Sequence, residues 1–136
     1  NAVICATSAH VNADESAANF PRPYYWHGNE PDLQTMGARG STGAISGVAN
    51  IAPGLVDRLV SQHASPAAPR DQQRMLALLE ILGGYGLTAA FKGAMALRHG
   101  NRGWLRVRAP LVALTDAELA RLEGQLRAFA IDPLSD

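Results

Sequence analysis

The chain has 136 residues, the length of one modest domain, and its 12 basic and 12 acidic side chains give a formal net charge of zero. This balance argues against nucleic acids and anionic membrane surfaces as partners, because both attract proteins with clustered positive charge. Apolar residues make up 47% of the chain, which is typical of a packed core and excludes a disordered polar sequence. Cys5 is the single cysteine, so the chain has no internal disulfide.

Three short runs predict strands. Residues 2–6 (AVICA) form an apolar run with β-branched side chains, and residues 24–27 (YYWH) form an aromatic run bounded by proline and glycine. Residues 44–46 (AIS) form a third run in a glycine-rich setting. The stretch 12–21 is expected to be a weak helix or a loop.

Helices are predicted from apolar residues at helical spacing and from their end signals. Their expected ranges are 31–38, 50–62, 70–82, 88–98 and a last helix that follows Thr115. Thr115 and Glu118 form a capping box, and Leu114 and Leu119 occupy the positions of a hydrophobic staple. Residues 105–114 are expected to be extended, with an interruption at Pro110.

Strands thus alternate with helices in the first sixty residues, and helices alone follow. This order predicts an α/β fold that ends in a helical appendage. We expect a boundary between the two parts at residues 64 and 65.

Targeting signals are not apparent in the sequence. The apolar runs are shorter than the roughly 20 residues that span a bilayer. Residues 1–10 carry neither the basic segment nor the long apolar run of a signal peptide. With no disulfide framework, we expect a cytoplasmic protein without a membrane partner.

Isolated residues offer weak candidates for chemistry. The four histidines are far apart, without the spacing of metal ligands, so we expect neither a metal nor a cofactor; they are His10, His27, His63 and His99. Cys5 is either a buried, inert thiol or a nucleophile. Lys92, the single lysine, is either a surface side chain or an amine nucleophile.

Two polar or glycine-rich stretches follow predicted strands or turns. Asn29, Glu30 and Asp32 come after a strand end, where ligand-contacting groups collect in parallel α/β folds, or they cap the next helix. The glycines at 37, 40 and 43 form either an anion cradle or a tight turn before a buried strand.

Longer stretches resemble a known family. Residues 37–60 (GARGSTGAISGVANIAPGLVDRLV) are similar to the eighth-strand region of the dihydrodipicolinate synthase and N-acetylneuraminate lyase family. His27–Glu30 lies at the separation of that family's seventh-strand segment. FKGAMAL at 91–97 and VRAPLVALTDAELARL at 107–122 resemble its C-terminal helices.

The resemblance implies the C-terminal part of a (β/α)₈ TIM barrel followed by a C-terminal helical extension. It also implies a lyase or aldolase that acts on pyruvate or another 2-oxo acid through a lysine imine. The family lysine belongs on the sixth strand, where this chain has Cys5. The resemblance therefore assigns no catalytic residue to this chain, and it matches Lys92 to a lysine of the helical extension.

Site-lining positions carry over residue by residue. The resemblance places backbone and side chains near a 2-oxo acid at Gly28, Asn29, Glu30, Ile45, Ser46 and Gly47. Three hypotheses remain open: part of a working aldolase, a non-catalytic or truncated relative that serves as a structural or interaction module, or hydratase-like, imine-free chemistry on the same scaffold. A few barrel strands leave open sheet edges, so we expect an oligomer or a complementing N-terminal half.

Overall fold

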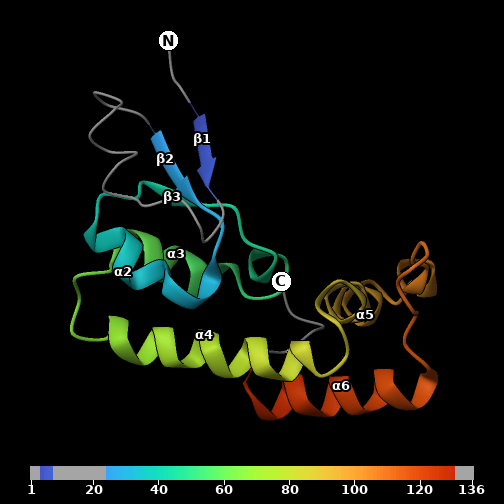
Figure 1. Ribbon diagram of the computed structural model, residues 1–136. Helices are drawn as coiled ribbons and strands as arrows, with labels where there is room; N and C mark the ends of the chain where they lie inside the picture. Colours follow the sequence, from blue (N-terminus) through green and yellow to red (C-terminus); the bar gives the residue numbers. More distant parts are fainter. Residues whose placement is uncertain (1–3, 8–23, 131–136) are drawn as a thin grey trace. The chain divides into compact units, whose positions relative to one another are not determined.

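The computed structural model describes residues 4–7 and 24–130 of the chain (Figure 1). The described residues form two compact units by their contacts. The first contains the described residues up to Ala49 together with Pro53–Leu76, and the second contains Asn50–Ala52 and the residues from Ala77 onward.

Three parallel strands form the sheet of the first unit, in the order β1-β2-β3. They are β1 (Ile4–Thr7), β2 (Tyr24–His27) and β3 (Gly43–Ala44). In the parallel register, Thr7 is opposite His27, and His27 is opposite Ala44. All three strands therefore end at one edge of the sheet, to which the arrowheads of Figure 1 point.

The predicted strands agree with this sheet except at β3. The strand expected over 2–6 is found at 4–7, with residues 2 and 3 outside the described residues, and the strand at 24–27 is confirmed. The strand expected over 44–46 ends at Ala44 instead. Beyond it the Ile45 N–H still donates to the His27 carbonyl at 2.9 Å, but the chain then turns into the 3-10 helix η2 (Val48–Asn50). The stretch 12–21 lies outside the described residues.

Two helices accompany the sheet. The 3-10 turn η1 (Glu30–Asp32) leads into α2 (Leu33–Ala38), and α3 (Pro53–Ser61) follows η2. Their apolar faces meet in a buried core. Its largest members are Leu33, Met36, Val48, Leu55, Val56, Leu59 and Met75.

The glycine-rich stretch after α2 forms a tight turn. Gly40 has a φ of +93°, a left-handed conformation that favours glycine. The Ser41 N–H donates to the Met36 carbonyl at 2.9 Å, and the Gly40 N–H donates to that of Gly37 at 3.0 Å. This pair of hydrogen bonds is a Schellman motif, so Gly40 serves to end α2 before β3.

The remaining helices confirm the helical C-terminal part. They are α4 (Ala68–Gly83), α5 (Leu87–His99), the 3-10 turn η3 (Arg102–Leu105) and α6 (Asp116–Ala128). Gly100 ends α5 in the left-handed conformation, and the capping box of Thr115 and Glu118 begins α6. In the described part of the chain no single helix is long and apolar enough to cross a membrane; α4 and α5 pass that test only jointly and are bent by 96°.

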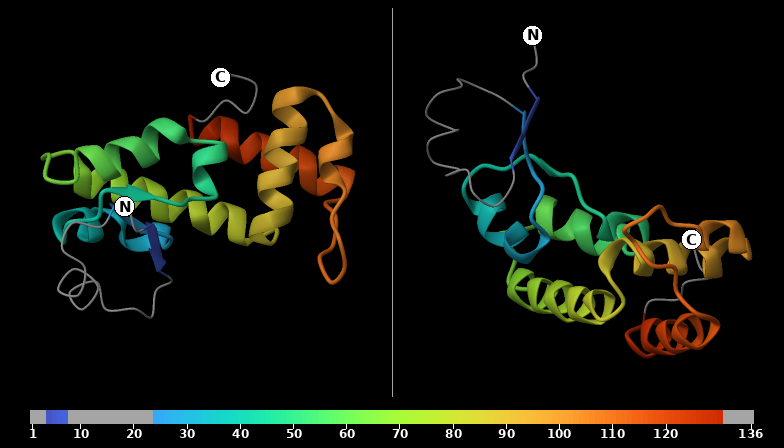
Figure 2. Two further views of the ribbon diagram at one scale, coloured as in Figure 1. Left: turned by 90° about the horizontal axis from the view of Figure 1, so that it is seen from above. Right: turned by 45° about the vertical axis from the view of Figure 1, so that its right-hand side comes forward.

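Close packing of α5 against α6 depends on Gly93. A Cβ atom at this position would lie 2.6 Å from Leu114 Cδ1, 3.2 Å from Leu122 Cδ2 and 3.4 Å from Leu119 Cδ1. The predicted staple residues Leu114 and Leu119 are both buried here. The views of Figure 2 show α5 lying across α6. The missing side chain of Gly93 leaves room for the leucines that pack against α5.

Candidate functional site

The candidate site lies at the carboxyl edge of the parallel sheet. Residues 28–30 leave β2 at this edge, and residues 45–47 leave β3 beside them. Loops at the carboxyl ends of parallel strands carry the ligand-contacting groups in α/β folds. The sheet register therefore brings both predicted site-lining segments to the same edge.

Glu30 joins the two segments directly. Its Oε1 atom accepts a hydrogen bond from the Ser46 hydroxyl at 3.0 Å and from the Gly47 N–H at 2.8 Å. Glu30, Ser46 and Gly47 are half-buried. Hydrogen bonds to a carboxylate are about twice as strong as neutral ones, so this carboxylate holds the turn after β3 against the loop after β2.

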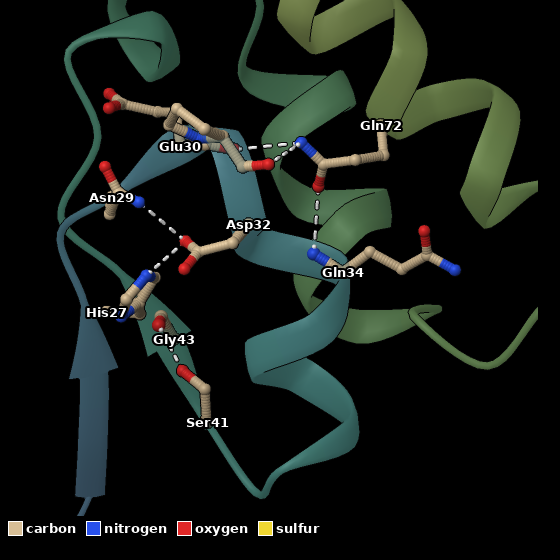
Figure 3. A network of polar contacts seen from close by, with 9 residues as sticks. His27, Asn29, Glu30, Asp32, Gln34, Ser41, Gly43 and Gln72 are labelled. Atoms are coloured by element: carbon tan, nitrogen blue, oxygen red, sulfur yellow. Dashed lines mark hydrogen bonds and ion pairs between the residues drawn. The ribbon is translucent and has the colours of Figure 1, made fainter. Parts of the chain in front are cut away.

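Asp32 organises the β2 loop from within (Figure 3). Its Oδ1 atom lies 2.6 Å from His27 Nε2 and accepts from the Asn29 amide at 3.0 Å. The His27 side chain is buried. Asp32 occupies the N-cap position of α2, but its carboxylate makes no cap hydrogen bond there and bonds to His27 and Asn29 instead.

Gln72 on α4 holds the same loop from the other side. Its amide Nε2 donates to the carbonyls of Glu30 and Pro31, both at 3.0 Å, and its Oε1 accepts from the Gln34 N–H at 3.0 Å. Figure 3 shows these bonds reaching from α4 to η1 and the start of α2. Sequence reasoning missed Gln72, because a glutamine in an amphipathic helix carries no signal of a partner about 40 residues away.

A neighbouring ion pair anchors α4 beside Gln72. The Arg58 guanidinium on α3 donates to Asp71 through Nε at 2.7 Å and Nη2 at 3.2 Å. The hydrogen bonds from Arg58 lower the pKa of the Asp71 carboxyl, and the same contact raises the pKa of Arg58. Asp71 and Gln72 together fix the first turns of α4 against α3 and the site loop.

The other predicted site-lining positions lie at the same edge of the sheet, but they differ in their hydrogen bonds to the loops. The Asn29 amide is engaged with Asp32, and Gly28 is exposed where β2 ends. Ile45 is 52% exposed and bonds through its N–H to β2. Cys5 lies in β1 opposite Tyr25, and its side chain is outside the described residues.

Trp26 is a second residue that sequence reasoning did not single out. It is 36% exposed, whereas the next residue, His27, is buried, so the two lie on opposite faces of the sheet. A Cβ on Gly43 would lie 2.8 Å from Trp26 Cδ1. The indole therefore lies across the glycine of β3.

The minor candidates have structural explanations or stay untested. The His63 ring bonds to the Val60 carbonyl at 3.1 Å, and His99 stacks on Trp104 with 6.0 Å between ring centroids. His10 lies outside the described residues. Across residues 4–7 and 24–130, no three His, Cys, Asp or Glu side chains gather as metal ligands.

The fold of this chain is similar to parts of several solved structures. The chain matches dihydrodipicolinate synthase from Agrobacterium tumefaciens with a TM-score of 0.71 and 26% identity, over 93% of this chain and 42% of that enzyme. It matches dihydrodipicolinate synthase from Aquifex aeolicus with a TM-score of 0.78 and 18% identity, over 98% and 47%. N-acetylneuraminate lyase from Fusobacterium nucleatum, complexed with pyruvate, matches with a TM-score of 0.77 and 17% identity, over 93% and 43%.

The chain resembles part of these enzymes. The resemblance predicted from its sequence is thereby confirmed, and the coverage is consistent with a C-terminal half. The chain spans less than half the length of the solved structures that it matches. No family model matches it, and neither does any curated protein. The relatives are TIM-barrel enzymes, and the present chain shares with them a short parallel sheet and a larger helical part.

Proposed function

We propose that this chain supplies the last strands of a (β/α)₈ barrel and its helical extension in a lyase or aldolase acting on pyruvate or another 2-oxo acid. In this proposal the barrel part ends near residue 64 and the extension follows. The substrate is a small molecule, and the site-lining residues are Gly28, Asn29, Glu30, Ile45, Ser46 and Gly47. The likeness to lyases and synthases of this class supports the proposal.

The observation that carries the proposal is the Glu30 bridge. The carboxylate binds Ser46 and Gly47 across two neighbouring strand ends, and an ordered carboxyl edge is where barrel enzymes hold their substrates. Because Asp32 and Gln72 fix the loop that carries Glu30, the edge is ordered before a ligand arrives. A site ordered in advance loses less entropy on binding.

Completion of the barrel by further strands is part of the proposal. Within the described residues β1 and β3 are edge strands, and exposed apolar side chains are found at Trp26 on β2 and at Ile45 just after β3. Open edges and exposed apolar surface favour association. The isolated chain is accordingly expected to form oligomers or to bind a hydrophobic dye, and a compact, dye-silent monomer in a sedimentation experiment would count against this part.

The chemistry of the class runs through an imine. A lysine amine adds to the ketone carbon of the 2-oxo acid and releases water, and the imine then accepts the electron pair of the carbon–carbon bond. A thiol cannot form this imine, and the sequence resemblance aligns Cys5 with that lysine. This residue favours a second candidate function, a non-catalytic relative that retains the fold as a binding or structural module.

Borohydride trapping distinguishes the two candidates. The full protein is incubated with pyruvate, reduced with sodium borohydride, and every chain is weighed and mapped by mass spectrometry. A reduced pyruvyl group on a lysine establishes the imine enzyme and locates the lysine. An unmodified protein that still binds pyruvate in a calorimetric titration is the expected result for the non-catalytic relative, and failure of both trapping and binding overturns the 2-oxo acid proposal.

Substitutions make the trapping experiment sharper. Cys5→Lys restores an amine at the corresponding position and is expected to create a trapped adduct at residue 5 if the correspondence is right. Lys92→Gln is the matched control, because it removes the single lysine of this chain. An adduct that disappears in Lys92→Gln would move the chemistry to α5 and contradict the assignment of the site to the sheet edge.

A further inference from the structure

The second unit contains a long stretch of sequence with basic residues and no acidic ones. Between Glu80 and Asp116 the sequence has no acidic residue, although the whole chain is neutral. The same stretch holds five basic residues, which are Lys92, Arg98, Arg102, Arg106 and Arg108. Their partners, or lack of partners, indicate which of them have a structural role.

Two of the five have clear structural partners. The Arg98 guanidinium donates to the carbonyls of Asn50 at 2.8 Å and Ile51 at 3.3 Å. Arg102 forms an ion pair with Asp116 at the start of α6. These two cations are therefore explained by the packing of the unit.

The other three cations have no such explanation. Among the described residues, none forms a hydrogen bond or an ion pair with the side chain of Lys92, Arg106 or Arg108. Like charges repel one another when they lie close together. Three cations around one pocket without a carboxylate give it a positive potential, which attracts anions.

All three line the same pocket. It has a volume of about 410 Å³, and its walls are Thr88, Lys92, Arg106, Val107, Arg108 and Leu111. Thr88 and Lys92 lie one turn apart on the same face of α5, and the rest come from the segment after η3. Thr88 is the second residue of α5, whose first turn carries the positive end of the helix dipole.

We propose that this pocket binds a small organic or inorganic anion that carries at least two negative charges, as a phosphate or as a dicarboxylate. The guanidinium groups of Arg106 and Arg108 present paired N–H donors that match the oxygens of a phosphate or a carboxylate. The Lys92 ammonium adds a point charge, and the Thr88 hydroxyl adds a donor. Val107 and Leu111 supply an apolar wall for the carbon skeleton of an organic ligand.

Calorimetric titration of the full protein tests the proposal at constant ionic strength. Inorganic phosphate and succinate are the two multivalent probes, which separate the phosphate source from the dicarboxylate source, and acetate is the monovalent comparison. At least one multivalent probe is expected to bind at least tenfold more tightly than acetate. Equal or undetectable binding of all three probes overturns the proposal.

Three variants assign the binding to this pocket. The variant Lys92→Gln is expected to weaken binding of the preferred probe at least tenfold. The double variant Arg106→Gln/Arg108→Gln is expected to weaken it by at least the same factor. Arg127→Gln is the matched control, because it removes one positive charge from α6, where Arg127 pairs with Glu123. Equal weakening by Arg127→Gln would mean a general charge effect and would overturn the site. Arg106 and Arg108 are exposed, so their variants are expected to keep the wild-type unfolding temperature.

This inference stands apart from the proposed lyase function in its readout. Anion titration requires no imine, and borohydride trapping requires no anion in the α5 pocket. Loss of trapping with retained phosphate or succinate binding would contradict only the enzymatic proposal, whereas the reverse result would contradict only the anion pocket.

Discussion

The carboxylate of Glu30 accepts a hydrogen bond of 2.8 Å from the backbone N–H of Gly47, between the ends of two neighbouring parallel strands. The Ser46 hydroxyl donates to the same oxygen atom. One side chain thereby orders both segments that the family resemblance marks as site-lining.

Removing the Glu30 carboxylate is expected to loosen the turn after β3. Glu30→Ala leaves two donors without their acceptor and should lower the free energy of unfolding by about 1–3 kcal/mol. Glu30→Gln keeps an acceptor oxygen in the same place and should cost less than the alanine variant. Urea unfolding of the full protein measures both, and identical losses in the two variants would contradict the acceptor role.

Gln72 is expected to matter far more than its neighbour Gln73. Gln72→Ala removes three hydrogen bonds to the loop and should destabilise the protein by about 1–3 kcal/mol. Gln73→Ala is the matched control, because Gln73 is an exposed residue of the same helix. The Gln34 amide should also exchange its hydrogen faster in Gln72→Ala, and unchanged protection there would refute the bridge.

Alanine at two helical glycines should have opposite effects. Gly93→Ala places a methyl group 2.6 Å from Leu114 Cδ1 and close to Leu122, and overpacking of this kind costs about 1–3 kcal/mol. In α6, a Cβ at Gly124 meets nothing within 4 Å, so Gly124→Ala should stabilise the helix by about 0.5–1 kcal/mol. Thermal unfolding reports both changes, and stabilisation by both substitutions would show that α5 and α6 are less tightly packed at Gly93.

The Arg58–Asp71 pair predicts a stability that depends on pH. The pKa of Asp71 is lower in the folded state than its ordinary value of 3.8, so the folded protein releases this proton more readily than the unfolded chain. The contribution is therefore fully present above about pH 4 and is lost as the pH falls through the folded pKa.

Asp71→Asn isolates that contribution. At pH 7 the variant should lose about 1–2 kcal/mol, at the lower end for a charged hydrogen bond because the Arg58 side chain is 41% exposed. The difference in unfolding free energy between wild type and variant should shrink as the pH falls below 3.8. A difference that stays constant down to pH 2 would assign the effect to packing and not to the charge.

Short-range signals explain why the element boundaries were predictable from the sequence. The capping box at Thr115 spans three residues, and Gly100 ends α5 by its own backbone conformation. The strand at 24–27 was likewise visible as an aromatic run between a proline and a glycine. The predicted strand at 44–46 was too long, because Ser46 and Gly47 bond to Glu30 and do not continue the ladder.

The sequence by itself determined the helical C-terminal part, the α/β order and the family resemblance, because propensity, capping and turn chemistry act over a few residues. Only the tertiary structure decided the partners of Glu30, which lie 16 and 17 residues away, and of Gln72, whose carbonyl acceptors lie 41 and 42 residues away. It also decided that Lys92 shares a pocket with Arg106 and Arg108. Such contacts depend on how α4 and α5 pack against distant segments, and that packing follows from the summed burial of apolar faces, which no local pattern records.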